Sequence, residues 1–149
     1  MQRTALILSA FVSVVALGQP LAPARAADAP MIIAADALNW APAQGLPPGA
    51  QVAVLYGDPS KAGPFAIRFK FPAGYEIATH SHPTDEFLTI ISGQGRMTFG
   101  PGADATNAQA LSQGTFMSLP AEALHHLWID ADTVIELHST GPFIVTLAK

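Results

Sequence analysis

The sequence predicts an antiparallel all-β domain, either a sandwich or a barrel. Short segments that alternate apolar and polar residues recur along the C-terminal two thirds of the chain. Glycine and proline separate these segments, and both residue types mark the turns between strands. No segment shows the periodicity of an amphipathic helix. Strands that return through short turns pair antiparallel, so a closed or two-layered all-β fold follows.

The first 26 residues have the pattern of a secretory signal peptide. Arg3 precedes an apolar run over 5–17, and Ala24-Arg25-Ala26 matches the A-x-A cleavage pattern. The run is shorter than the roughly 20 apolar residues that a membrane-spanning helix needs, which favours cleavage over an anchor. No twin-arginine pair is present, which predicts export in the unfolded state. We therefore expect a mature chain over 27–149 that is periplasmic or secreted.

The charge and composition of the mature chain exclude some classes of binding partner. Loss of Arg3 and Arg25 leaves five basic residues against eleven acidic ones, so the net charge moves from -4 to -6. This balance argues against nucleic acid or an anionic membrane surface as a partner. Cysteine is absent, so no thiol can act as nucleophile or metal ligand. The hydrophobic share of 50% predicts a well-filled core or a buried dimer face, and we expect a homodimer.

Residues 27–50 are expected to form an N-terminal arm to a single domain over 51–149. Met31-Ile32-Ile33 could add a strand, and Leu38 and Trp40 could anchor the arm. Several prolines and glycines follow Trp40 and oppose regular structure there. Two interpretations stay open: Trp40 covers the end of the domain, or the arm crosses to a second subunit.

The strands are predicted in chain order from period-two alternation and turn residues. They cover 51–56, 65–71, the segment with His80 and His82, 87–91, 96–99, 115–119, 125–129, 133–139 and 143–147. The loop 100–107 is too small and polar to be an element. In 65–71 the apolar side chains share one face, and Arg68 and Lys70 share the other. That second face is either solvated or aims one cation into a cavity as an anion clamp.

Two histidines and a carboxylate fall close together at His80, His82 and Glu86. On a strand, alternation places both histidines on one face. Pro83 cannot continue a central ladder, so the chain turns there and the next strand brings Glu86 back beside the histidines. Imidazole and carboxylate groups bind divalent first-row metals. The segment therefore predicts a metal site.

This spacing resembles the first signature of the cupin family. Five residues separate Gly74 from His80-x-His82, three separate His82 from Glu86, and six separate Glu86 from Gly93. No defined position of the signature departs from the family pattern.

A second segment resembles the other cupin signature. Gly114, Pro120 and His125 match, whereas Glu122 stands where the pattern has glycine and Ile129 where it has asparagine. The resemblance implies a cupin-type double-stranded β-helix, which is an antiparallel jelly-roll barrel. It does not imply a reaction, because cupins perform many reactions on one barrel.

The resemblance also implies one metal ion held by His80, His82, Glu86 and His125. Such a set leaves positions free for water, oxygen or substrate, which is typical of catalysis rather than of a structural site. The alternative is a group of satisfied polar side chains in a barrel whose metal was lost. Manganese, iron, nickel, copper and zinc are all admissible, and export favours copper or zinc on affinity. One carboxylate against a divalent cation leaves net positive charge, so an anionic or enolisable oxygen ligand should bind best.

Adjacent residues on a strand face opposite sides, so only one of His125 and His126 can reach the metal. The cupin spacing selects His125. A different turn at Glu122 would shift the strand by one residue and select His126 instead. His126 otherwise has a surface, interface or ligand-supporting role.

His138 is the candidate catalytic acid or base. It shares a face of its predicted strand with Glu136. If that face lines the cavity, His138 could transfer protons near neutral pH, and if it faces solvent it has no role.

Three functions are compatible with the sequence. The first is an exported metal-dependent enzyme, an oxygenase or a lyase/isomerase, that acts on a small organic molecule. The second is a cupin that binds a metal or small ligand without turnover, and the third is a structural cupin whose role is dimerisation. The remaining carboxylates beside the signatures, Glu76, Asp85 and Glu122, are interpreted as loop charges, which keeps the binding function open.

Overall fold

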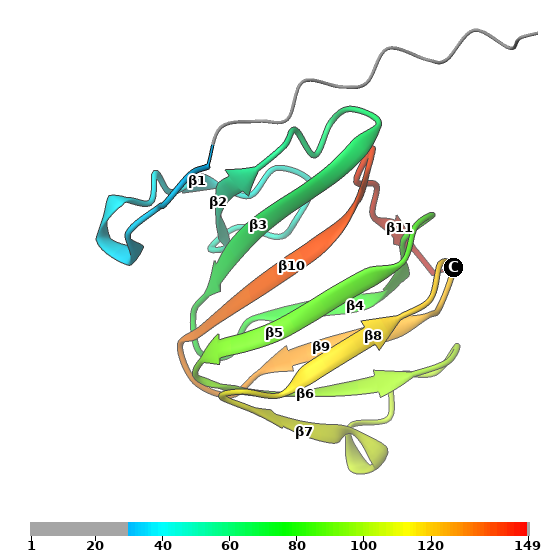
Figure 1. The fold of residues 1–149 in the computed structure, drawn as a ribbon. Helices are drawn as coiled ribbons and strands as arrows, with labels where there is room; N and C mark the ends of the chain where they lie inside the picture. Colours follow the sequence, from blue (N-terminus) through cyan, green and yellow to red (C-terminus); the bar gives the residue numbers. More distant parts are fainter. Residues whose placement is uncertain (1–29, 149) are drawn as a thin grey trace, which may run out of the picture. The chain divides into compact units, whose positions relative to one another are not determined.

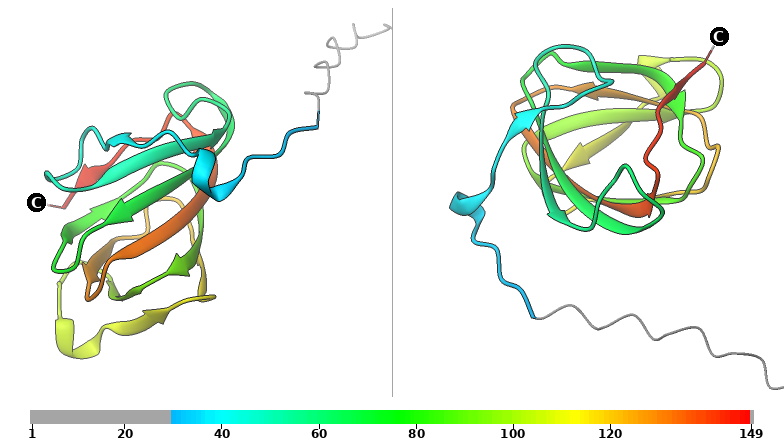
Figure 2. Two further views of the ribbon diagram at one scale, coloured as in Figure 1. Left: turned by 90° about the vertical axis from the view of Figure 1, so that its left-hand side faces the viewer. Right: turned by 90° about the horizontal axis from the view of Figure 1, so that it is seen from above.

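The strands form two antiparallel sheets that face each other (Figure 1). The computed structural model describes residues 30–148. Within these residues, one sheet has the strand order β1-β2-β3-β10-β5-β8 and the other has the order β11-β4-β9-β6-β7. Seen from above, the strands curve around a common interior (Figure 2). This arrangement is the jelly-roll barrel that the sequence predicts, and the all-β prediction is confirmed.

The elements alternate with short turns in chain order. The strands are β1 (Ala41–Pro42), β2 (Gln51–Tyr56), β3 (Gly63–Phe71), β4 (Glu76–Ser81), β5 (Glu86–Ser92), β6 (Gln94–Phe99), β7 (Gln109–Ser112), β8 (Phe116–Leu119), β9 (His125–Ile129), β10 (Thr133–Gly141) and β11 (Thr146–Leu147). Two 3-10 turns, η1 (Ala35–Ala37) and η2 (Ala105–Asn107), stand outside the sheets. Among the described residues no helix is long and apolar enough to cross a membrane.

Along the long strands β3 and β10, alternate side chains point into the core between the two sheets. Every second residue of β3 from Phe65 to Phe71 is buried, as are Ile135 and Leu137 of β10. Side chains of the two sheets meet in one apolar core, which also includes Ile77, Leu88, Ile90, Met97, Leu111, Met117, Leu119, Leu127 and Ile129. Strands that are half buried in this way fold because burial of their apolar face offsets the chain entropy lost on ordering.

The cationic face of β3 lies outside the barrel. The Arg68 Nε donates to Glu136 Oε2 on β10 at 2.7 Å, and the Lys70 Nζ lies 4.2 Å from the centre of the Trp40 ring. Neither side chain lines the histidine cavity, so the anion clamp considered for these two residues does not form there. Trp40 covers the outer face of β3 rather than the end of the barrel.

The N-terminal arm joins the sheet of its own chain. Its strand is Ala41–Pro42, which pairs with β2, whereas the expected strand at 31–33 is absent. Residues 1–26, the predicted signal peptide, lie outside the described residues. The boundaries at 26 and 50 stay predictions.

Two strand predictions near the C-terminal half need correction. The prediction missed β7, an edge strand in which only Leu111 is buried, so its alternation is too short to recognise. The predicted strand over 143–147 is reduced to Thr146–Leu147, because the Phe143 N–H donates to Pro59 O rather than to a neighbouring strand. The predicted loop 100–107 holds the short turn η2, in which Asp104 Oδ1 accepts from Thr106 N.

Two glycines of the first signature have left-handed backbones but different surroundings. Gly74 has a φ of 79° and Gly93 a φ of 89°. A Cβ on Gly74 would meet open space, whereas a Cβ on Gly93 would overlap the Asp132 carbonyl and the Thr133 side chain. Gly93 is therefore required by close packing as well as by its backbone conformation.

We expect Gly93→Ala to destabilise the barrel much more than Gly74→Ala. Each change costs roughly 1–2 kcal/mol for a left-handed alanine, and Gly93→Ala adds an overlap worth roughly 1–3 kcal/mol. Urea unfolding of both variants measures the difference. Equal free energies of unfolding for the two variants would show that the close approach at Gly93 is not a constraint.

Candidate metal centre

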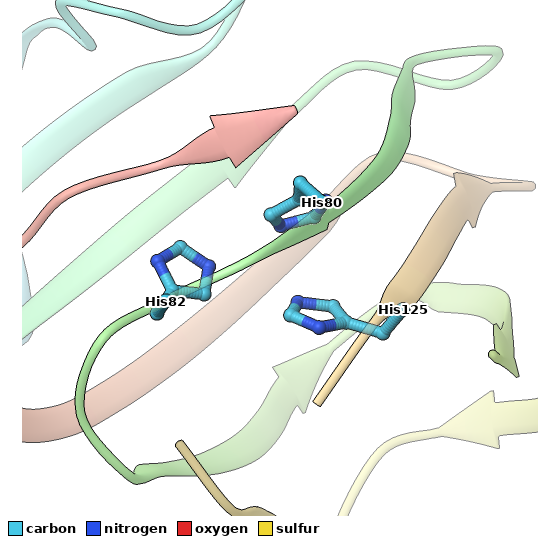
Figure 3. A group of neighbouring side chains, drawn as sticks. All are labelled: His80, His82 and His125. Atoms are coloured by element: carbon cyan, nitrogen blue, oxygen red, sulfur yellow. The ribbon is translucent and has the colours of Figure 1, made fainter. Parts of the chain in front are cut away.

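Three histidine side chains from two neighbouring strands meet inside the barrel (Figure 3). His80 lies near the end of β4, His82 directly follows that strand, and His125 opens β9. His80 and His125 are register partners in the ladder between β4 and β9. One ring nitrogen from each of the three histidines lies within 4.8 Å of the other two, and all three residues are buried.

A β-bulge in β4 gives His80 its inward direction. Ile77 pairs with Leu127 and His80 pairs with His125, so β4 takes three residue steps where β9 takes two. Without the extra residue, alternation would place Ile77 and His80 on opposite faces of the sheet. Both are instead buried. The bulge therefore changes which face of β4 the side chains point to, just before the histidine pair.

Backbone carbonyls fix the orientation of each ring. The Nδ1 atoms of His80, His82 and His125 lie 2.8, 2.8 and 2.9 Å from the carbonyl oxygens of Ala78, Ile144 and Ala123. A carbonyl oxygen can only accept, so each Nδ1 carries the hydrogen and donates it. The Nε2 atoms are left without a hydrogen. This is the tautomer in which Nε2 binds a metal, and the carbonyl bonds hold the rings in place.

Glu86 opens β5 and lies beside the three histidines. Its Oε2 lies 3.4 Å from His82 Nε2 and 3.7 Å from His125 Nε2. The residue is 2% exposed, and among the described residues Oε2 has no hydrogen-bond partner. A buried carboxylate oxygen without a partner is costly, and a cation between it and the imidazoles removes that cost. The residues present therefore fit a divalent metal.

Burial shifts the protonation of all four groups. It raises the pKa of Glu86 to about 8. Burial, together with the neighbouring His125, lowers the pKa of His80 to about 3 and that of His82 to about 4. The pKa of His125 is also lowered by burial. At neutral pH the imidazoles are thus neutral and ready to coordinate, and without a metal the Glu86 carboxyl carries a proton.

The cavity around this group is small and apolar. Its volume is about 40 Å³, room for only a few waters. Apart from the four candidate ligands, its lining is apolar: Leu46, Phe69, Phe71, Ile77, Leu88, Met97, Leu127, Ile135, Leu137, Phe143 and Val145. The site therefore holds few waters among mostly apolar side chains.

His126 faces the other side of β9. Its Nε2 lies 2.7 Å from Glu76 Oε1, its Nδ1 lies 3.2 Å from Thr79 Oγ1, and its ring stacks on Trp128. His125 alone of the pair joins the inner histidines, as the cupin spacing implies.

Glu122 keeps the backbone that a glycine would provide. Its φ is 64°, and among the described residues it is the one non-glycine with a positive φ. Its N–H donates to His82 O at 2.8 Å. Glu122 thus has the left-handed backbone that a glycine commonly adopts, and His125 rather than His126 faces the inner histidines. Ile129, in the position of the family's asparagine, is a core residue.

His138 does not face the histidine cavity, so the prediction that it acts there as an acid or base is wrong. Ile135 and Leu137 face inward on β10, so Glu136 and His138 face outward by alternation. The His138 side chain is 54% exposed, and its Nε2 lies 2.9 Å from Glu136 Oε1. His138 lines no part of the histidine cavity.

The sequence did not predict that the segment between β10 and β11 contacts the histidines. Ile144 supplies the carbonyl that holds His82, and the Phe143 ring stacks on the His82 ring with centroids 4.6 Å apart. Neither residue belongs to a motif, and both reach the site only because the chain returns alongside β4.

Comparison with known proteins agrees with this geometry. The model of the ChrR cupin-like domain matches residues 28–144. No curated protein matches the chain. Solved structures with different activities share the fold. The polyketide cyclase RemF from Streptomyces resistomycificus has a TM-score of 0.68 at 10% identity, over 81% of this chain and 87% of that chain.

Two further structures are similar to this chain. A putative acetylacetone dioxygenase from Methylibium petroleiphilum has a TM-score of 0.64 at 20% identity, over 84% of this chain and 85% of that chain. The DMSP lyase structures of RdDddP and RnDddQII give 0.58 at 15% identity, over 75% of this chain and 63% of that chain. At these identities the likeness shows the fold alone.

We expect Glu86 to make the stability of the metal-free protein fall as pH rises. Its pKa in the folded state, about 8, lies above the ordinary 4.5, so its contribution is complete below pH 4.5 and is lost as pH rises through 8. The loss is roughly 1.4 kcal/mol per pH unit in that window. Glu86→Gln removes it. Thermal unfolding of chelator-treated protein at pH 5, 7 and 9 should show the two proteins nearly equal at pH 5 and the variant more stable at pH 9.

The pKa values of His80, His82 and His125 are lowered, which makes stability rise with pH. This effect is present in both the wild type and Glu86→Gln, so it cancels when their stabilities are compared. Glu122→Gln, at an exposed carboxylate, is the matched control and should follow the wild type. If the difference in stability between the wild type and Glu86→Gln did not change with pH, the raised pKa of Glu86 would be contradicted.

Proposed function

Because the chain belongs to the ChrR cupin-like domain family, we propose that it is an exported mononuclear metal enzyme that acts on a small organic molecule. The reaction is that of an oxygenase or of a lyase/isomerase. The proposal of export rests on the sequence of residues 1–26, and the proposal of a homodimer rests on composition. The exposed Phe87 and Phe116, on the neighbouring strands β5 and β8, support a dimer face.

One observation carries the metal proposal. Three buried imidazoles in their neutral form lie together, and two of them, His82 and His125, lie 3.4 and 3.7 Å from a buried Glu86 oxygen that lacks a hydrogen-bond partner among the described residues. Each Nδ1 donates to a backbone carbonyl, so the lone pair of each neutral ring is on Nε2, where a metal can bind it. His80, His82, His125 and Glu86 would hold the ion. Iron, manganese, nickel, copper and zinc all accept this donor set.

A bound divalent metal would supply Lewis acidity toward an oxygen donor of the substrate, or a site for oxygen if it is redox-active. The protein supplies the orientation of the rings, because each Nδ1–H donates to a backbone carbonyl. The apolar lining excludes water and strengthens electrostatic interactions inside the cavity. Glu86 can hold a proton near neutral pH when it is not a ligand.

The geometry favours an enolisable oxygen ligand as substrate. Four ligands with one negative charge leave a divalent site with net positive charge, which attracts an enolate or carboxylate oxygen. The structural neighbours include a putative dioxygenase, a lyase and a cyclase, so the fold is compatible with either proposed reaction class. A β-dicarbonyl compound such as acetylacetone is therefore a reasonable first test substrate.

A second function is a cupin that binds a metal or ligand without turnover. One observation favours it: among the described residues, Glu86 is the one carboxylate lining the cavity, and it is already a candidate ligand. Oxygen consumption and product analysis with acetylacetone, under air and under nitrogen, separate the three cases. An oxygenase needs air, a lyase turns over in both, and a binding protein in neither.

We expect His80→Ala, His82→Ala and His125→Ala to lose stoichiometric metal, with affinity falling by several orders of magnitude, while the barrel stays folded. His126→Ala removes a residue outside the cavity and should lower affinity by about 10–100-fold at most. Competition titration with zinc measures each affinity, and far-ultraviolet circular dichroism checks the fold. Weaker zinc binding by His126→Ala than by His125→Ala would mean that His126 is the ligand.

A further inference from the structure

A larger pocket lies next to the histidine cavity. It has a volume of about 410 Å³ and is formed by the turn at 42–46 and by Phe143 and Val145 of the C-terminal segment. We call it the arm pocket. Four residues line both spaces: Leu46, Phe69, Phe143 and Val145. These side chains form the wall between the arm pocket and the histidine cavity.

The chemistry of the arm pocket is apolar. Val52, Ile67 and the four wall residues provide its sides, and Gln44 and Ser60 are its polar side chains. None of the described residues that line it carries a charge. Its volume falls within the range of small-molecule sites, roughly 300–1,000 Å³. The pocket is therefore suited to an uncharged apolar group rather than to an anion.

Most of the wall comes from irregular segments. Leu46 lies in the connection between β1 and β2, and Phe143 and Val145 lie between β10 and β11. All three are only partly buried, whereas Phe69 belongs to the central strand β3. Loop segments with few buried contacts open at lower free-energy cost than strands. The wall can therefore yield without disturbing the sheets.

The backbone of Phe143 is held by a hydrogen bond, whereas its ring makes packing contacts only. Its N–H donates to Pro59 O at 2.7 Å, and the next residue, Ile144, holds His82 through its carbonyl. The ring packs between His82 and Phe65, at 4.6 and 5.6 Å between centroids. A rotation of the ring would therefore leave in place the backbone contacts at Pro59 and His82.

We propose that the substrate carries an oxygen donor at one end and an uncharged apolar group at the other, and that the apolar group occupies the arm pocket. Leu46 and Phe143 are then the side chains that determine substrate length. This inference rests on the proposed metal function for the oxygen end. It follows because a cavity of about 40 Å³ holds only a few atoms, and the neighbouring space is apolar.

The first test uses alkyl hydroxamates, which bind a metal through two oxygens and carry an alkyl tail of chosen length. Zinc-loaded protein should bind hexanohydroxamate on the order of 100-fold more tightly than acetohydroxamate, because four more methylenes are buried. Gln44→Trp fills the arm pocket from an exposed position and should reduce this ratio to below about 5-fold, since the tail loses its apolar surroundings. The affinity for acetohydroxamate should not change.

The matched control is Gln113→Trp, at an exposed position in the turn between β7 and β8, which should keep the wild-type ratio. Isothermal titration measures each affinity. Equal binding of the two hydroxamates by the wild type, or an undiminished ratio in Gln44→Trp, would overturn the inference.

The second test needs no metal. In chelator-treated protein, 1-hexanol should cause saturable shifts of the Val52 methyl signals, which report on the arm pocket, and Gln44→Trp should abolish them. Absence of a saturable Val52 shift would overturn the inference. Failure of zinc or acetohydroxamate to bind while the Val52 shift persists would overturn the metal function and support the arm pocket as a site for apolar groups.

Discussion

The burial of the Glu86 carboxyl group constrains the whole interior of this protein. A carboxylate in an apolar cavity is stable only if it is protonated or if a positive charge lies next to it. Here the neighbouring side chains are imidazoles whose own pKa values are lowered by burial, so they provide no charge at neutral pH. Without a cation the group therefore keeps a proton at neutral pH, and it is incomplete because its Oε2 has no hydrogen-bond partner among the described residues. That incompleteness, and not the count of histidines, is the strongest physical argument for a metal.

The strands are built to hold this arrangement. The bulge in β4 turns His80 inward, and the ladder with β9 places His125 beside it. Main-chain carbonyls then fix the three rings, so the ligands are ordered before an ion arrives. Preorganised ligands lose little entropy on binding. The cost falls instead on folding, which must bury four polar side chains in an otherwise apolar barrel.

The C-terminal segment links the metal centre to the outer pocket. The carbonyl of Ile144 orients His82, and the ring of Phe143 covers it. Phe143 also lines the arm pocket. A substrate that displaces the Phe143 ring would therefore change the surroundings of one candidate ligand directly. Phe143 would thus couple the length of the substrate to the metal centre. The segment that carries Phe143 belongs to neither cupin signature.

The sequence by itself determined the class of fold and four candidate ligands. Period-two alternation reveals half-buried strands such as β3 locally, and the spacing of His80, His82, Glu86 and His125 is a property of the chain. Only the tertiary structure decided what depends on parity and on distant contacts. His138 lies outside because β10 turns Leu137 inward, and the bulge in β4 is invisible in the residue pattern. The contacts of Phe143 and Ile144 with His82 arise because the chain returns past β4, which no local pattern encodes.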